Sequence, residues 1–181
     1  SVTRTLGATP VTSQTEYDGN DNVSAVIDEE GRQYEATYDV KNNLTGIKLR
    51  NYQADPAANS APFDLQVQSY EYDDQNRRKA TIDAEGRRVE FTNFDVGDQP
   101  RTTTLKNFLP LPSNLGGPGG SPVDIVLAEK TFDRVGNPLT EFNGNQTAKV
   151  TNVYKPSGLL ESVSRTRGTT SIVDRASNFG Y

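Results

Sequence analysis

The chain has 181 residues, a net charge of −5, 33% hydrophobic residues and a mean hydropathy of −0.71. It contains neither cysteine nor histidine, which excludes disulfides, thiolate chemistry, the common zinc ligand sets and every catalytic triad that uses histidine. The negative charge and the lack of long basic runs argue against a nucleic-acid-binding surface, and no apolar stretch is long enough to cross a bilayer. Methionine is also absent, which leads us to expect a piece of a larger or processed protein.

In chain order, an aromatic residue followed by aspartate recurs. The pairs are Tyr17-Asp18, Tyr38-Asp39, Tyr72-Asp73, Phe94-Asp95 and Phe132-Asp133, with degenerate copies at Tyr154-Lys155 and Val173-Asp174. The period is about 20 residues, which indicates a repeat architecture, once two Pro- and Gly-rich inserts are set aside. These inserts, 51–64 and 107–124, are expected to be loops.

Within each repeat the pattern predicts a strand, a turn and a returning strand. The outward strands are predicted at 23–28, 79–83 and 139–143, and the returning strands at 32–39, 87–95 and 146–154. Short runs bounded by Gly, Asn and Asp are typical of consecutive β-hairpins, and no stretch keeps helical periodicity. We therefore predict one all-β array of antiparallel hairpins over residues 1–181 that forms a curved or spirally wound sheet. Val89 and Phe91 are out of phase with Phe94, which predicts a β-bulge between 91 and 94.

A longer duplication accompanies the short period. The segment KLRNYQADP (48–56) aligns with TLKNFLPLP (104–112), so a unit of 55 to 60 residues occurs at least twice.

With these motifs in view, the chain resembles the RHS/YD-repeat family. The resemblance rests on IDEEGRQYEATYD (27–39), TYDVKNNLTGI (37–47), IDAEGRRVEF (82–91) and TFDRVGNPLTEF (131–142), and it covers residues 16–181 apart from the inserts. The residues that carry the repeat motif are Tyr17, Asp18, Gly31, Tyr38, Asp39, Tyr72, Asp73, Gly86, Phe94, Asp95, Phe132, Asp133, Gly136, Tyr154 and Gly158.

The repeated aspartates have two interpretations. In one, each aromatic side chain is buried in the inner layer of the sheet, and the aspartate accepts backbone N–H groups of the adjoining turn. In the other, the carboxylates line a substrate groove. Because the pair recurs at every period, the sequence favours the structural interpretation.

Other acidic residues are candidates for catalysis by paired carboxyl groups. Glycoside hydrolysis needs two carboxyl groups about 5–10 Å apart, one of them with a raised pKa. The candidates lie in predicted turns, where carboxylates are usually solvated, so we expect no catalytic residue and no cofactor; they are Asp28, Glu29, Glu30, Asp83 and Glu85.

Calcium binding is an open alternative at residues 18–22, DGNDN. Asp18, Asp21 and Asn22 offer oxygen ligands around a glycine, although the spacing is not that of an EF-hand. The same residues are ordinary turn formers. Three N-glycosylation patterns, at Asn22, Asn43 and Asn145, follow from the turn residues of the repeat itself.

What the resemblance implies is a β-ribbon wound into a hollow shell or tube, which in the toxins of the family encloses a cytotoxic C-terminal segment. We expect a non-enzymatic structural segment of a secreted or surface-exposed bacterial shell, tube or filament, with further YD repeats or copies of itself as partners. A fragment of a toxin-encapsulating cocoon, with an enclosed effector, is the alternative. A module that binds a surface glycan or receptor through the inserts is a third possibility.

Overall fold

The computed structural model describes residues 2–6, 9–54, 61–110, 113–115, 117, 119–144, 147–168 and 176–177. Regular structure in these residues is β-strand, apart from one turn of 3-10 helix at Ser113–Leu115. None of the described helical structure is long and apolar enough to cross a membrane. The strands are β1 Val2–Leu6, β2 Thr9–Tyr17, β3 Val23–Ile27, β4 Gln33–Tyr38, β5 Leu44–Tyr52, β6 Phe63–Tyr72, β7 Arg78–Asp83, β8 Arg88–Phe94, β9 Pro100–Phe108, β10 Val123–Phe132, β11 Pro138–Asn143, β12 Ala148–Tyr154, β13 Leu160–Arg167 and β14 Ala176–Ser177.

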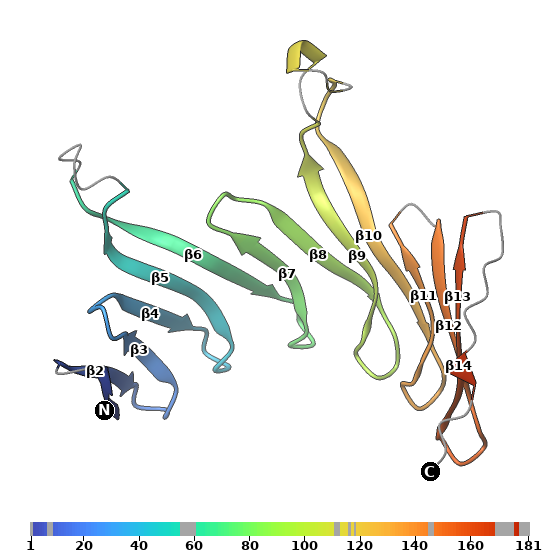
Figure 1. The fold of residues 1–181 in the computed structure, drawn as a ribbon, viewed down its shortest axis with the longest axis horizontal. Coiled ribbons are helices and arrows are strands. Elements are labelled where there is room, and N and C mark those ends of the chain that lie inside the picture. Colours follow the sequence, from blue (N-terminus) through green and yellow to red (C-terminus); the bar gives the residue numbers. More distant parts are fainter. Residues whose placement is uncertain are drawn as a thin grey trace. The chain divides into compact units, whose positions relative to one another are not determined.

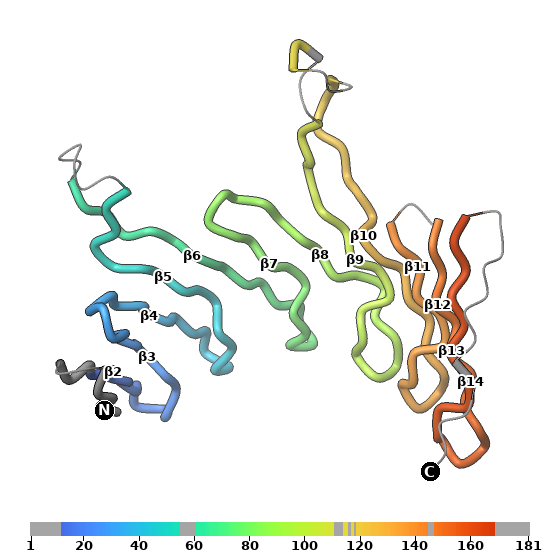
Figure 2. Tube along the Cα trace, in the orientation of Figure 1, coloured from blue at the N-terminus to red at the C-terminus, as the bar shows by residue number. Residues whose placement is uncertain are grey.

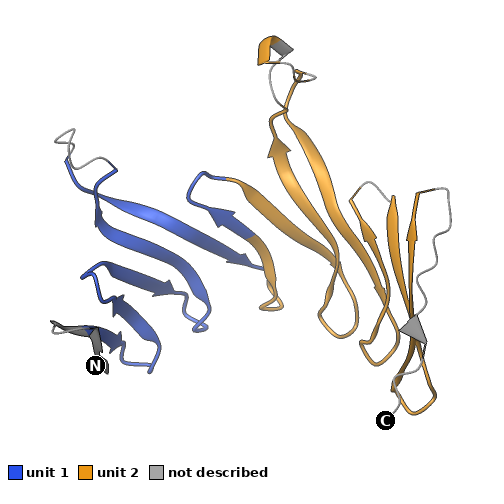
Figure 3. Ribbon diagram, viewed as in Figure 1, with its two compact units in different colours: residues 1–72, 81–86 blue, residues 73–80, 87–181 orange. Residues whose placement is uncertain are grey.

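The chain divides into two compact units (Figure 3). Unit 1 comprises residues 1–72 and 81–86, and unit 2 comprises residues 73–80 and 87–181, so β7 contributes to both. In unit 1 each strand from β1 to β6 pairs with the next one antiparallel, and in unit 2 the same holds from β8 to β14. The predicted all-β class and the succession of antiparallel hairpins are confirmed (Figures 1 and 2).

Most hairpins shift register just before the aromatic residue of the repeat. The shift lies between Glu16 and Tyr17 in the β2–β3 pair and between Thr37 and Tyr38 in the β4–β5 pair. It recurs before Phe132 and before Tyr154. Such a β-bulge adds one residue to one strand and increases the local twist of the strand at these four aromatic residues.

The two inserts are the ends of long hairpins. β5 continues to Tyr52 and β6 begins at Phe63, while β9 continues to Phe108 and β10 begins at Val123, so the outer residues of both inserts are strand and not loop. In Figure 1 the β9–β10 hairpin reaches past the ends of β11 to β13. Residues 55–60 and part of 111–118, at the centres of the inserts, lie outside the described residues.

These two hairpins repeat each other in structure. Both contain an asparagine with a left-handed backbone, Asn51 at φ 50° and Asn107 at φ 51°. Both shift register at that asparagine and again nearer the middle of the hairpin. Each asparagine donates its backbone N–H to an aspartate on the opposite strand, Asp64 at 3.3 Å and Asp124 at 3.1 Å. The duplication suggested by the sequence therefore extends to backbone conformation.

A cluster of three charges sits at the base of each long hairpin. Arg50 pairs with Glu35 on β4 and with Asp64 on β6. Lys106 pairs with Glu90 on β8 and with Asp124 on β10. The order acid, base, acid across three neighbouring strands is the same in both clusters. The paired charges are not directly opposite each other, because Glu35 faces Lys48 and Glu90 faces Thr104 in the strand register.

The aromatic residues of the repeats are less buried than predicted. Tyr17 is 62% exposed, and Tyr38, Tyr72, Phe94, Phe132 and Tyr154 are half-buried. The buried residues of the described chain are Ala25, Gly46, Ala80 and Asp95. The prediction of buried tyrosines was wrong because, among the described residues, neither unit has a second layer packed on its sheet. A large ring on a single sheet can only be covered by the neighbouring strands.

The β-bulge predicted between 91 and 94 is absent from the pairing of β8 with β9, whose register is constant from Arg88 to Phe94. A single residue, Asn93 at φ 55°, accounts for the broken alternation instead. Asparagine tolerates this left-handed conformation, so one residue can change the phase without an insertion. The seventh repeat, expected at Val173-Asp174, lies outside the described residues.

Candidate functional site: the turn edge and an adjoining pocket

The turn that follows each aromatic residue has one backbone form. Counting the aromatic residue as the first of the repeat, the fifth residue is left-handed in every described repeat: Asp21, Asn42, Asn76, Asp98, Gly136 and Gly158. The second residue donates its N–H to the carbonyl of the sixth and accepts the N–H of the fifth, as in Asp18 with Asn22 (2.8 Å) and Asp21 (3.2 Å). Gly, Asn and Asp occupy the fifth place because they tolerate a positive φ.

The aspartate carboxylates bind the backbone of these turns. In the first repeat, Asp18 Oδ1 accepts the N–H groups of Asn20 (2.8 Å) and Asn22 (2.9 Å). Asp18 Oδ2 accepts a hydrogen bond from the side-chain amide of Asn22 at 3.1 Å. The same arrangement holds Asp39 with Asn43, Asp73 with Arg77, and Asp133 with Asn137.

These hydrogen bonds stabilise the ionised carboxylates. The side-chain hydrogen bond from Asn22 lowers the pKa of Asp18 below 3.8, with help from the Asn22 backbone. Asn43 does the same to the pKa of Asp39, and Arg77 to that of Asp73. These carboxylates are therefore held charged, which suits a turn cap and not a general acid.

Asp95 departs from this arrangement. It is only 7% exposed, and its Oδ1 accepts the N–H groups of Gly97 and Gln99, both at 2.9 Å. Its Oδ2 has no hydrogen-bond partner among the described residues. The residue that would cap it, Gln99, instead donates its side-chain amide to the Gly136 carbonyl of the next repeat at 3.1 Å. Gln99 is one methylene longer than Asn22, Asn43 or Asn137, which allows this different contact.

Tyrosine hydroxyls join successive repeats. The Tyr38 hydroxyl donates to the Val23 carbonyl at 2.9 Å, the Tyr72 hydroxyl to the Leu44 carbonyl at 3.0 Å, and the Tyr154 hydroxyl to the Pro138 carbonyl at 3.2 Å. In each case the acceptor is the seventh residue of the preceding repeat. Phe94 and Phe132, at the same place in their repeats, have no hydroxyl to donate.

A second link joins neighbouring turns side by side. It runs from the sixth residue of one repeat to the fifth residue of the next: Asn22 to Asn42 (3.3 Å), Arg77 to Asp98 (3.3 Å), and Gln99 to Gly136. Neither link was predicted from the sequence. Aligning the repeats places a side chain with an N–H donor at the sixth place of the first five, which is the signal for the second link; these residues are Asn22, Asn43, Arg77, Gln99 and Asn137, and Leu159 follows at that place in the next repeat.

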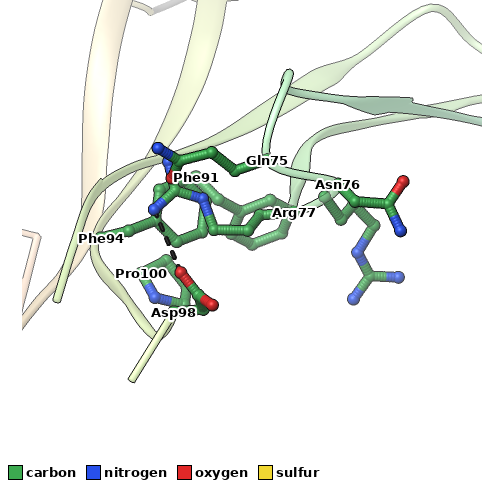
Figure 4. A pocket seen from close by; sticks show the side chains of 8 residues that line it. Gln75, Asn76, Arg77, Phe91, Phe94, Asp98 and Pro100 are labelled. Carbon is green, nitrogen blue, oxygen red and sulfur yellow. Dashed lines mark hydrogen bonds and ion pairs between the residues drawn. The ribbon is translucent and has the colours of Figure 1, made fainter. Parts of the chain in front are cut away.

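A pocket of about 460 Å³ opens beside Phe94 in unit 2 (Figure 4). Figure 4 shows Arg77 lying across Phe94 and directed to Asp98. The Arg77 guanidinium carbon is 4.2 Å from the centre of the Phe94 ring, and its Nη2 is 2.7 Å from Asp73 Oδ2. The pocket is lined by Gln75, Asn76, Arg77, Arg78, Phe91, Phe94, Asp98 and Pro100.

The acids considered for glycoside hydrolysis lie in turns on the other edge of the strands. Asp28 accepts hydrogen bonds from the Glu30 and Arg32 backbone and from the Arg32 side chain, while Asp83 accepts the Glu85 N–H at 3.0 Å. Desolvation raises the pKa of Asp28, but the bonds from Arg32 outweigh it and the pKa falls below 3.8. A glycosidase acid needs the opposite shift.

The calcium candidates form the first turn of the array. All of the Asp18 hydrogen bonds described above come from N–H donors, and Asn22 presents its amide nitrogen to that carboxylate. Asp21 holds the left-handed position of the turn at φ 62°. Among the described residues no three acidic side chains come together as a metal site. The same bonds engage the amide nitrogens of Asn22 and Asn43, two of the three glycosylation patterns.

No protein-family model matches this chain, and no curated protein sequence does. Solved structures are similar in fold. The chain matches the crystal structure of TcdB2-TccC3 without its hypervariable C-terminal region with a TM-score of 0.61 and 16% identity over 88% of its length. It matches the crystal structure of TcdB2-TccC3-Cdc42 with a TM-score of 0.51 and 13% identity over 94% of its length. It spans only 7% and 10% of those chains, so the comparison establishes a fold shared with segments of Tc toxin chains.

Proposed function

We propose that this chain is a non-enzymatic structural segment of an RHS/YD-repeat shell, tube or filament that is secreted or displayed on a bacterial surface. The observation that carries the proposal is the pair of links between successive repeats. Tyrosine hydroxyls bind the preceding repeat at three steps, and side chains of the sixth place bind the next turn at three steps. These hydrogen bonds hold successive repeats together. A continuous wall of repeats requires such contacts between neighbours.

The chemistry of the turn edge supports the absence of catalysis in this segment. The carboxylates Asp18, Asp39, Asp73 and Asp133 are engaged by backbone and side-chain N–H groups, and the pKa values of all four are lowered. Lowered pKa values remove them as general acids near neutral pH. The proposed partners are further YD repeats or copies of the same chain.

A second candidate function is a segment of a cocoon that encloses a toxic effector. It is favoured by the fold shared with segments of TcdB2-TccC3 chains. In this interpretation the repeats form the wall around an enclosed effector, and that effector is the partner of the chain. A module that binds a surface glycan or receptor through the inserts remains a third, weaker proposal.

Imaging the parent protein at low resolution tests these proposals. A hollow closed particle with internal density supports the cocoon, whereas an open tube or a filament supports the first proposal. A parent in which this segment folds as an isolated globule, without contacts to further repeats, overturns both. As a second test, sedimentation of the 181-residue chain over a wide concentration range reports on self-association: a strict monomer removes copies of itself as partners.

A further inference from the structure

Asn143 and Gly144 form the only Asn-Gly dipeptide in the sequence, and they lie where β11 ends. This dipeptide has a chemistry of its own, because glycine has no side chain to hinder its backbone nitrogen. That nitrogen can attack the carbonyl carbon of the asparagine side chain and close a five-membered succinimide ring. The functions proposed above use neither residue.

The structure requires a glycine at position 144. Asn143 lies opposite Ala128 on β10, next to the place where β10 shifts its register with β9, between Val126 and Ala128. A Cβ on residue 144 would collide with the Val126 carbonyl and would lie 3.1 Å from the Leu127 Cα. Both neighbours are backbone and cannot swing aside as a side chain can. Close approach of another backbone is a common reason for glycine within a sheet.

The structure also uses the asparagine at position 143. Asn143 Oδ1 accepts the Ala148 N–H at 2.8 Å, and Asn143 Nδ2 donates to the Thr147 hydroxyl at 3.1 Å. Both ends of the amide therefore hold the turn that joins β11 to β12. An ionised aspartate would keep the acceptor and lose the N–H donor. Two separate local requirements thus bring asparagine and glycine together.

We propose that Asn143 is a site of spontaneous deamidation whose rate is set by the opening of the turn between β11 and β12. The Gly144 nitrogen loses its proton and forms a bond to Asn143 Cγ, while the Cγ–Nδ2 bond breaks and ammonia leaves with the proton. Water then opens the succinimide to aspartate or isoaspartate. The steps need no metal, oxidant or cofactor.

The hydrogen bonds of the closed turn oppose this reaction. They hold the Asn143 amide on Thr147 and Ala148, so the Gly144 nitrogen can reach Cγ only after these bonds have broken. Deamidation is therefore slow in the closed hairpin and fast in the open one.

The product changes the hairpin in two ways. Each conversion adds a negative charge at Asn143, which is exposed. Isoaspartate also lengthens the backbone by one methylene next to Gly144, where the Val126 carbonyl leaves no room. The site goes beyond the proposed structural role, because it would mark chains in which this hairpin has been open.

Peptide mapping by mass spectrometry tests the proposal on the 181-residue chain, incubated in mildly alkaline buffer with and without denaturing guanidinium chloride. Asn143 is expected to be the most rapidly modified asparagine in the denatured chain. Folding is expected to slow its conversion by more than about tenfold, because two hydrogen bonds must break first. An intact Asn143 in denaturant, or equal rates in the folded and denatured chains, would overturn the proposal.

A variant of Thr147 tests the role of the turn. Thr147→Val removes the hydroxyl that binds Nδ2 and keeps the shape of the side chain. It is expected to speed the conversion of Asn143 about fivefold in the folded chain, the effect of one hydrogen bond, and to leave the rate in denaturant unchanged. Thr151→Val, on β12 and away from the turn, is the matched control and should change neither rate. An unchanged folded-state rate in Thr147→Val, or the same acceleration in both variants, would contradict control by the turn.

The result is independent of the structural proposal. Asn143 can stay intact while the parent still forms a shell or filament, and the reverse is equally possible.

Discussion

At the scale of single residues, the hydrogen bonds made at a given place in the repeat depend on which side chain stands there. A tyrosine in the first place links to the preceding repeat, and a phenylalanine does not. An asparagine in the sixth place caps its own aspartate, and Asn22 also reaches the next turn. A glutamine in that place, Gln99, reaches only the next repeat with its amide. Variation within a degenerate motif therefore changes the contacts between repeats.

Removing the hydroxyl of Tyr38 tests the link between repeats. Tyr38→Phe is expected to lower the free energy of unfolding by about 1 kcal/mol, because one hydrogen bond to the Val23 carbonyl is lost. Urea denaturation measures the change. Tyr17→Phe is the matched control and is expected to have almost no effect, since Tyr17 is 62% exposed and its hydroxyl has no hydrogen bond within the described part of the chain. Equal losses in the two variants would contradict the assignment.

Shortening Gln99 tests the exception at Asp95. In Gln99→Asn the amide can reach Asp95 Oδ2, as Asn137 reaches Asp133 at 2.9 Å, but it can no longer reach the Gly136 carbonyl. One hydrogen bond replaces another, so the total stability is expected to change by less than about 1 kcal/mol. Hydrogen exchange of the backbone amides should slow at Gly97 and Gln99 and accelerate in residues 133–137.

Gln99→Ala is the control for that prediction, because it loses the link and gains no cap. It is expected to cost about 1 kcal/mol. If Gln99→Asn destabilises the chain as much as Gln99→Ala, the amide does not move to Asp95.

At the scale of elements, the two long hairpins, β5–β6 and β9–β10, have three features in common; each hairpin is called an arm below. Each has a left-handed asparagine at a register shift, an aspartate across from it, and a charge cluster at its base. Several of the charged side chains in these clusters are more than about a third exposed to solvent. Each ion pair therefore contributes little to the stability of the fold by itself. The backbone conformation is the stronger determinant of the arm.

Substituting Asn51 or Asn107 tests this determinant. Asn51→Ala and Asn107→Ala are each expected to cost about 1–2 kcal/mol, because alanine has a Cβ but lacks the short polar side chain whose local hydrogen bonds let asparagine adopt the left-handed region. Asn51→Gly and Asn107→Gly are expected to retain stability, since glycine adopts this region readily. Chemical denaturation of the four variants measures the difference, and equal losses for alanine and glycine would mean that the asparagine side chain matters more than the backbone.

At the scale of the whole molecule, the recurring carboxylate caps make stability depend on pH. The pKa values of Asp18, Asp39 and Asp73 are lowered by side-chain hydrogen bonds in the folded chain, and the pKa of Asp124 is lowered by Lys106. A group with a lowered folded pKa binds protons more readily when unfolded. Its contribution to stability is complete above the unfolded pKa and is lost as the pH falls through the folded pKa.

Stability is therefore expected to be steady from pH 7 to about 5 and to fall steeply below about 3.8, the ordinary value for aspartate. Urea denaturation at a series of pH values measures the fall. Asp39→Asn should flatten the curve slightly, because one of the linked carboxylates is gone. A chain whose stability rises on acidification below pH 4 would contradict this role of the carboxylates.

The sequence by itself determined the all-β class, the hairpin succession and the turn residues. These follow from local rules: two-residue alternation in strands, and Gly, Asn or Asp where the backbone must be left-handed. The duplication of the inserts was also visible, because their residue types align over 48–56 and 104–112. No comparable local rule tells how much each ring is covered by neighbouring strands.

The tertiary structure decided what links one repeat to the next. Residues such as Tyr38 and Val23, or Gln99 and Gly136, become neighbours only after the strands pair in a particular register. It also decided that the tyrosines are half-exposed, because burial depends on the layers above a sheet and not on the pattern within a strand. The pocket beside Phe94 was likewise decided by the tertiary structure, because its lining residues from 75–78 and 91–100 come together only when the strands pair.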